Sequence, residues 1–257
     1  MPKKDMFFKS KNSKEDYFRW RTERSKEFIS CLNKFTSLAN KKVLDLGCGQ
    51  GALSYVLASK GAKVFALDAS DAALRQAKEF CKGKNIIFRK STSKKLPFKD
   101  GYFDVITLFY VLEHVSDIKG ILDESKRILK KGGYLCVEFP PYYSLTGHHL
   151  YRFTLLPMQY FPKSFVKWYL LNGKPDNCQA EDIADVPTTP AAAWNTFRTL
   201  SRITISRFRR LSKGMKILDE RFIFKYPGFF SVNIGILRDI PVLREVLSLS
   251  YFAVMKK

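Results

Sequence analysis

Acidic residues are scarce in this chain, and long apolar runs are absent from it. The 257 residues include 24 Asp or Glu against 45 Lys or Arg, a formal net charge of +21. No apolar run reaches the roughly 18 residues that span a bilayer. The Lys-rich segment 1–14 has no apolar stretch of the kind that forms a secretory signal. We therefore expect a cytoplasmic protein, with peripheral contact as its one route to a membrane.

Cysteine and histidine are also few. The five cysteines are odd in number, scattered, and never spaced as CxxC. This pattern predicts reduced thiols, and it excludes a disulfide framework and the common zinc-binding spacings. We accordingly expect no metal site.

The excess of positive charge has several explanations. A basic surface attracts phosphate groups, on nucleic acid or on anionic lipid. It is equally compatible with a general adaptation for solubility. Charge alone does not select one of them, and it says nothing of the oligomeric state.

The chain nevertheless has the composition of a folded protein, since 46% of it is hydrophobic. Short apolar strands alternate with helical segments, which predicts an α/β fold with a parallel sheet buried on both faces. The helical segments include Ala52–Ser59, a helix capped by Ser70, and Leu122–Leu129, which we expect Gly132-Gly133 to end. The expected strands are Lys42–Leu46, Val64–Leu67, Ile86–Phe88, Phe103–Tyr110 and Tyr134–Glu138.

Four regions follow from this pattern. Residues 1–40 form a basic helical segment, and residues 41–140 form the alternating core. Residues 141–196, rich in aromatic and basic side chains, form a cap inserted after the fifth strand. Residues 197–257 complete the core with one amphipathic helix, Phe197–Leu211, and two strands, Met215–Phe224 and Ser248–Met255.

The turn after the first strand carries the clearest chemical signal. Gly47, Gly49 and Gly51 occupy alternate positions between a strand and a helix, where glycine allows close backbone approach to a ligand. The spacing differs from the G-x-G-x-x-G of dinucleotide sites. Asp45 would repel a diphosphate but suits a ligand with an amino group, such as S-adenosylmethionine. Asp68 ends the second strand, where an acid binds ribose hydroxyls.

Together with Leu96-Pro97-Phe98, Phe103-Asp104 and Leu112-Glu113-His114-Val115, these residues resemble class I S-adenosylmethionine-dependent methyltransferases, most closely the type 11 domain. The resemblance covers about Lys42 to Glu138. It implies a Rossmann-like sheet of seven strands, mostly parallel, with the last antiparallel and helices on both faces. It also implies S-adenosylmethionine as cofactor and S-adenosylhomocysteine as product. The cofactor-binding residues that we infer are Asp45, Gly47, Cys48, Gly49, Gly51, Asp68, Ala69, Thr92, Ser93 and Phe109.

One position departs from the family. An acid often precedes the Leu-Pro-Phe by four residues and contacts the adenine amino group, whereas Thr92 stands here beside Ser93. A hydroxyl accepts a hydrogen bond more weakly than a carboxylate does. For the acceptor side we select His114, which follows the fourth strand, and His148, His149 and Tyr142, which follow the fifth, as candidate catalytic residues. For His114 the alternative is packing near the cofactor or orienting a loop. For His148 and His149 it is a surface pair on a loop, and for Tyr142 it is ordinary packing of the cap.

The acceptor itself stays open at this stage. A small-molecule, lipid-linked or glycan-linked acceptor fits the aromatic cap, and the cap's mixture of aromatic and basic residues also fits peripheral contact with an anionic membrane. RNA is the second acceptor class, favoured by charge alone. Phe139-Pro140-Pro141-Tyr142 lacks the amide or acid of base N-methylating enzymes. A binding protein without turnover is the remaining alternative.

Overall fold

The fold is described from a computed structural model. It describes residues 13–91, 95–144, 147, 149–150, 153–154, 156–172, 187, 189–223 and 240–257. Thr92, Ser93 and His148 lie outside these residues, as does most of the second half of the cap.

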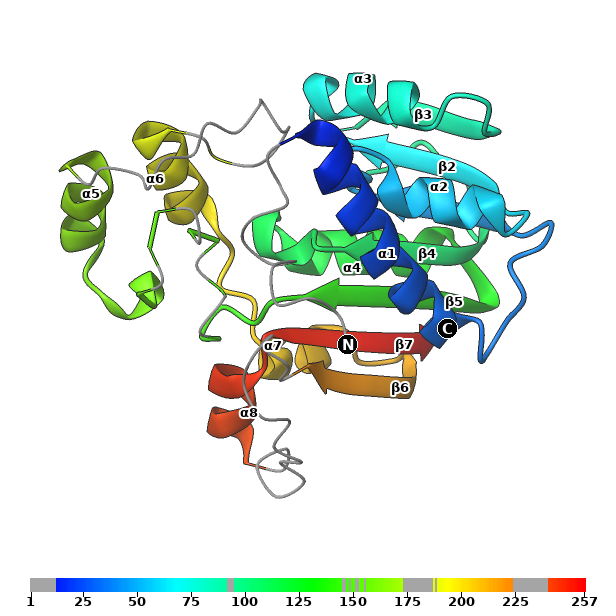
Figure 1. Ribbon diagram of the computed structural model, residues 1–257. Helices are drawn as coiled ribbons and strands as arrows, with labels where there is room; N and C mark the ends of the chain where they lie inside the picture. The colour runs from blue at the N-terminus through cyan, green and yellow to red at the C-terminus, as the bar shows by residue number, and fades with distance from the viewer. Residues whose placement is uncertain are drawn as a thin grey trace, which may run out of the picture.

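A single seven-stranded sheet with the order β3-β2-β1-β4-β5-β7-β6 forms the centre of the molecule (Figure 1). Strands β1 to β5 run parallel, and β7 is antiparallel to both of its neighbours, β5 and β6. The Rossmann-like α/β sheet is therefore confirmed, with its one reversed strand. The strand bounds are β1 Lys42–Leu46, β2 Lys63–Asp68, β3 Ile86–Lys90, β4 Phe103–Phe109, β5 Leu129–Phe139, β6 Lys216–Ile223 and β7 Ser250–Lys256.

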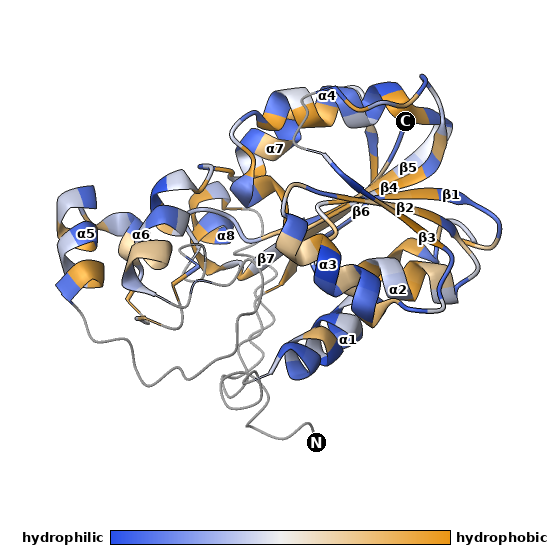
Figure 2. Cartoon of the chain, turned by 90° about the horizontal axis from the view of Figure 1, so that it is seen from above, coloured by the Kyte–Doolittle hydropathy of each residue, from blue (hydrophilic) through white to orange (hydrophobic). Residues whose placement is uncertain are grey.

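Helices cover both faces of this sheet, as Figure 2 shows from above. On one face lie α1 (Lys14–Leu32), α2 (Ala52–Ser59) and α3 (Asp71–Phe80), and on the other lie α4 (Ile118–Ile128) and α7 (Ile205–Leu211). Successive β1 residues point to opposite faces, so Val43 joins the apolar core under α1 and α2, and Leu44 joins the core under α4 and α7. A short helix, α8 (Pro241–Leu247), precedes β7.

The cap follows β5 and has a small apolar core of its own. It contains the 3₁₀ turn η2 (Met158–Tyr160) and the helices α5 (Lys163–Asn172) and α6 (Pro190–Thr199). Its buried side chains are Tyr142, Leu150, Met158, Val166, Leu170, Ala193, Phe197 and Leu200. The cap projects from the end of the sheet at which β5 finishes (Figure 1).

Two details of the sequence analysis were wrong. The expected helix Phe197–Leu211 is two helices, because α6 ends at Thr199 and α7 begins at Ile205. Between them, Ser201 bonds to backbone carbonyls of the loop after β4 instead of to its own helix, and Thr204 caps α7. Likewise, Gly132-Gly133 does not end a helix. Helix α4 stops at Ile128, and both glycines lie inside β5, where Gly132 has a φ of 76°.

Candidate functional site

The turn between β1 and α2 holds three glycines in left-handed conformations, with φ of 76° at Gly47, 52° at Gly49 and 82° at Gly51. A Cβ on Gly47 would lie 2.5 Å from Val111, and one on Gly51 would lie 2.9 Å from Cys81 Sγ. A Cβ on Gly49 would meet no described atom within 4 Å. The outer two glycines therefore permit close packing, and the middle one faces open space.

Asp68 is held at the carboxyl end of β2 by the same turn. Its Oδ2 accepts a hydrogen bond from the Gly49 amide at 2.8 Å, and its Oδ1 accepts one from the Ser70 amide at 2.9 Å. Each carboxylate oxygen has a second lone pair available for a ligand hydroxyl. Ala69 follows on the exposed turn before α3. The backbone thus fixes the orientation of Asp68 beside the open space over Gly49.

Asp45 lies beneath the turn, where its side chain is 1% exposed. Its carboxylate accepts hydrogen bonds from Ser54 at 2.6 Å and from Thr107 at 3.1 Å. Burial raises its pKa to about 6, although both hydroxyls oppose that rise. Cys48, in the turn above, is also buried, and its thiol pKa is raised by burial.

Arg21 on α1 brings positive charge to this edge of the sheet. Its guanidinium lies 4.5 Å from the centroid of the Phe109 ring, at the end of β4, a cation–π distance. Burial raises the pKa of three acids near this edge, Asp45, Glu113 and Glu138, and the charge of Arg21 opposes part of that rise. Arg21 could not be selected from the sequence, because no local pattern shows which face of a helix in residues 1–40 meets the sheet.

Glu113, in the 3₁₀ turn η1 (Leu112–His114) after β4, is the most unusual acid in the structure. It is 2% exposed, and neither carboxylate oxygen has a hydrogen-bond partner among the described residues. Burial raises its pKa to about 8. Its Oε1 lies 3.8 Å from His149 Nε2. One signal in the sequence pointed to it, a carboxylate directly before His114 at the end of a buried strand.

His149 and His114 meet at this point although they are far apart in sequence. Their rings lie 5.0 Å apart in an edge-to-face arrangement, and His149 has a φ of 56°. A left-handed conformation is uncommon for a residue other than glycine and is frequent at functional sites. The ligand-type atoms of Glu113, His114 and His149 all lie within 4.8 Å of one another. These residue types also bind metals, so the expected absence of a metal stays a prediction.

Tyr142 stands at the start of the cap, directly after β5 and Pro140-Pro141. It is buried, and its ring contacts Tyr143 at 5.1 Å and the Arg202 guanidinium at 5.9 Å. The returning chain bonds to the same region, because the Ser201 amide donates to the Glu113 carbonyl at 2.7 Å. The cap is thereby attached directly to the loop that carries Glu113.

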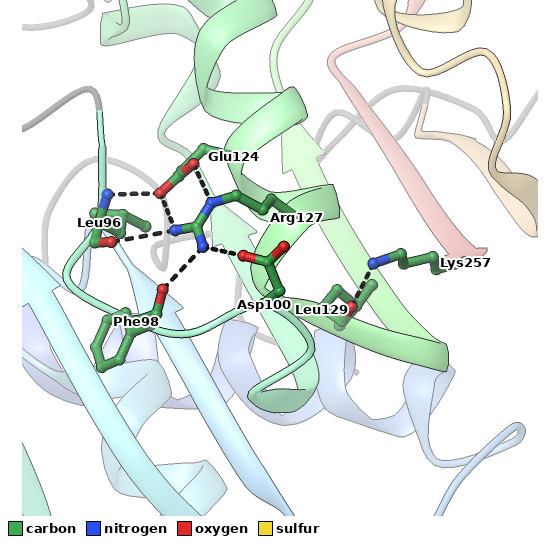
Figure 3. A network of polar contacts seen from close by, with 7 residues as sticks. All are labelled: Leu96, Phe98, Asp100, Glu124, Arg127, Leu129 and Lys257. Atoms are coloured by element: carbon green, nitrogen blue, oxygen red, sulfur yellow. Dashed lines mark hydrogen bonds and ion pairs between the residues drawn. The ribbon is translucent and has the colours of Figure 1, made fainter.

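The Leu96–Phe98 loop between β3 and β4 is fixed by Arg127 at the end of α4 (Figure 3). The guanidinium donates to the backbone carbonyls of Leu96 and Phe98 at 3.2 and 2.9 Å and to Glu124. Glu124 in turn accepts from the Leu96 amide at 2.6 Å. This network holds the motif on which part of the resemblance depends, immediately after the segment that contains Thr92.

Residues 44–137 match the family model described as a methyltransferase domain. Over these residues the chain is similar to methyltransferase domains. The glycine turn, Asp68, Phe109 and Glu113 all lie in the matched region, at the carboxyl ends of its strands.

Two curated relatives are similar to this chain over part of its length. The chain is 35% identical over 146 residues to the demethylmenaquinone methyltransferase of Tropheryma whipplei, a match that covers 51% of this chain and 61% of the relative. It is 39% identical over 101 residues to the ubiquinone biosynthesis O-methyltransferase of Nitrosomonas europaea, covering 38% and 43%. The matched region thus spans between two fifths and three fifths of these relatives.

Solved structures agree on the fold across nearly the whole chain. An S-adenosylmethionine-dependent methyltransferase from Mesorhizobium loti aligns with a TM-score of 0.55 at 16% identity, covering 93% of this chain and 98% of that one. Magnesium protoporphyrin IX methyltransferase from Synechocystis, solved with bound S-adenosylhomocysteine, gives 0.55 at 14% identity, covering 94% and 84%. At such identities the likeness shows the fold alone.

Proposed function

We propose that this protein binds S-adenosylmethionine and transfers its methyl group to a small-molecule acceptor. The observation that carries the proposal is the pairing of Gly49 with Asp68 at the carboxyl edge of the sheet. The turn leaves space beside a carboxylate whose orientation two backbone amides fix. That arrangement fits a ligand with ribose hydroxyls. When bound, S-adenosylmethionine supplies a methyl group already activated on a sulfonium.

The chain's own residues would then bind and orient the cofactor and the acceptor, and they would exclude water from both. Asp68 holds the ribose, the Gly47–Gly51 turn lies along the methionyl part, and Asp45 supports the turn from below. Phe109 and the Arg21 guanidinium close the side nearest α1. The names of the two curated relatives support an acceptor of the quinone-precursor kind, either free or carried on a lipid tail.

On the acceptor side, Glu113 and His149 form the pair best placed to receive a proton. A hydroxyl acceptor loses its proton as its oxygen bonds to the methyl carbon and the carbon–sulfur bond breaks. The Glu113 carboxyl, with a pKa of about 8, exchanges a proton close to neutral pH. His149 lies 3.8 Å away. The ring of His114 contacts the ring of His149, and Tyr142 lies at the start of the cap.

Calorimetric titration of the full chain with S-adenosylmethionine, and separately with S-adenosylhomocysteine, tests the proposal. We expect micromolar dissociation constants for both ligands. Incubation with radiolabelled S-adenosylmethionine and either aqueous or lipid cell extracts then identifies the acceptor class from the fraction that gains label. Absence of binding of either ligand would falsify the proposed function. Metal analysis of the same sample shows whether the Glu113 group carries an ion.

A further inference from the structure

Helix α5 has two apolar faces, of which only one is buried. Val166 and Leu170 are 0% and 1% exposed and pack into the core of the cap. The second face consists of Phe161, just before the helix, with Phe165, Trp168 and Leu171, and we call these four residues the α5 stripe. Spacings of three and four residues place the members of the stripe on one side of a helix.

The α5 stripe is strongly exposed. The exposed fractions are 39% for Phe161, 37% for Phe165, 61% for Trp168 and 47% for Leu171. The aromatic rings nevertheless touch one another, with centroids 5.2 Å apart between Phe161 and Phe165 and 6.0 Å apart between Phe165 and Trp168. The stripe is therefore one continuous apolar surface. A surface of this kind marks a site of interaction with a partner or a membrane.

The charged residues of α5 itself are both lysines. Lys163 and Lys167 are exposed on α5 at a spacing of four residues, so they lie together along the helix. The sequence contains no acidic residue between Glu138 and Asp176. A surface that combines aromatic side chains with unopposed lysines is complementary to anionic lipid headgroups, because the lysine stems cover apolar surface while their amines reach phosphate.

The position of α5 leaves the stripe accessible. In both views α5 is the described helix that projects farthest from the sheet on the cap side (Figures 1 and 2). None of the helices in the described residues is long and apolar enough to cross a membrane. A helix with one buried apolar face, one exposed apolar face and exposed lysines instead suits a position in the plane of the membrane interface.

We propose that the α5 stripe docks this protein on the surface of an anionic lipid bilayer. Trp168, the most exposed of the four, enters the headgroup region together with Phe165 and Leu171, and Lys163 and Lys167 contact lipid phosphates. The inference concerns the cap and goes beyond the proposed methyl transfer, since lipid docking requires neither the cofactor nor an acceptor.

A protein partner fits these observations less well. The cores of protein–protein interfaces are enriched in aromatic residues but depleted of lysine, whereas two lysines lie on the same short helix as the stripe. Aromatic residues next to lysines are instead typical of the membrane–water interface.

Vesicle flotation of the full chain tests the docking directly. We expect binding to vesicles of phosphatidylcholine with phosphatidylglycerol, little binding to phosphatidylcholine alone, and weakening at high salt. In a Trp20→Phe/Trp194→Phe variant, Trp168 is the one remaining tryptophan, because the chain has three. Its emission should shift to shorter wavelength on addition of the anionic vesicles.

Two variants separate the contributions, and both change exposed residues. Trp168→Ser/Leu171→Ser should lower the partition coefficient about tenfold or more, and Lys163→Gln/Lys167→Gln should remove most of the preference for anionic lipid. Val242→Ser, on α8 and 69% exposed, is the matched control and should bind as the wild type does. Circular dichroism confirms that each variant is folded.

Three results would overturn the proposal. The first is absence of binding to anionic vesicles, and the second is equal binding by the wild type and the Trp168→Ser/Leu171→Ser variant. The third is a blue-shifted Trp168 emission before vesicles are added, which would mean that another segment or a second copy already covers the stripe. Size-exclusion chromatography with light scattering distinguishes a second copy from another segment of the same chain. All these measurements are independent of methyl transfer.

Discussion

Arg24 on α1 and Glu138 at the end of β5 form an ion pair, with Nη2 of the arginine 2.8 Å from Oε1 of the glutamate. The glutamate side chain is 4% exposed and also accepts hydrogen bonds from Tyr110 and Ser250. The pair therefore ties the N-terminal helix to the edge of the sheet at which the candidate site lies.

Replacing Arg24 with Met should destabilise the protein, because a buried carboxylate then loses its opposing charge. We expect a loss of about 2 kcal/mol at pH 8, less than for a fully buried pair because Arg24 is 26% exposed. Burial already raises the pKa of Glu138 and Arg24 opposes that rise, so the variant's deficit should shrink as Glu138 gains a proton at lower pH. Urea denaturation at pH 8 and pH 5 measures the difference in free energy of unfolding between the variant and the wild type. Lys26→Met, in an exposed pair with Glu23, should have little effect.

The glycine turn predicts two different alanine phenotypes. Gly47→Ala places a Cβ 2.5 Å from Val111 at a φ of 76°, so it should lower both stability, by about 2 kcal/mol or more, and cofactor binding. Gly49→Ala meets open space and should cost only about 1 kcal/mol from backbone strain. It should still abolish binding, since its methyl group enters the ligand space. Thermal unfolding and calorimetry on both variants test the contrast, and full binding by Gly49→Ala would contradict the proposed ligand position.

Asp68→Asn should lower the affinity for S-adenosylhomocysteine at least tenfold. The amide keeps the shape of the side chain but loses the charge and one acceptor, which weakens hydrogen bonds to ribose hydroxyls. Asp71→Asn is the control, because Asp71 lies three residues away in an exposed pair with Lys90. Calorimetric dissociation constants that rise equally for both variants would show a general effect of charge instead of a ribose contact.

Glu113 should make stability depend on pH in a defined direction. Its pKa rises from 4.5 to about 8 on folding, so the folded state holds the proton more tightly than the unfolded state. The resulting stability is fully present below pH 4.5 and is lost as pH rises through about 8, by at most about 5 kcal/mol. Glu113→Gln cannot ionise. Its melting temperature relative to the wild type should therefore be several degrees higher at pH 9 than at pH 5, and a constant difference across this range would refute the assignment.

Once an acceptor is known, the same substitution tests the proposed proton transfer. The wild-type rate should rise as pH passes about 8, and Glu113→Gln should lose that inflection while its affinity for S-adenosylhomocysteine stays within about threefold. An unchanged pH profile would leave Glu113 with a structural role only.

The core of the fold follows from local sequence patterns. Strand β1 and helix α2 have the predicted bounds, and Ser70 caps α3 as expected, because apolar period and capping chemistry act within a few residues. The split between α6 and α7 could not be predicted in this way. It depends on Ser201 bonding to backbone atoms of residues 112 and 113, a tertiary contact that no helical periodicity reveals.

The same distinction between local patterns and tertiary contacts applies to the candidate site. The glycine turn and Asp68 belong to one strand–helix–strand unit, so the sequence predicted their proximity, and the Gly49–Asp68 hydrogen bond agrees with it. The roles of the other selected residues stay predictions. Arg21, Glu113 and Glu138 were missed, since each acquires its character from burial or from a partner on a distant segment. His114 and His149 were each selected, but their contact depends on how the chain after β5 turns back toward β4.

Strand β7 lies between β5 and β6 although it follows both in the sequence. During synthesis, the edge of β5 must therefore wait for more than a hundred further residues, roughly ten seconds of translation. Throughout that interval a long, apolar strand presents unpaired backbone groups, the feature that promotes association between chains. The topology therefore leaves the nascent protein prone to association between chains during this interval. Its yield in cells should depend on chaperones that occupy this edge until β7 emerges.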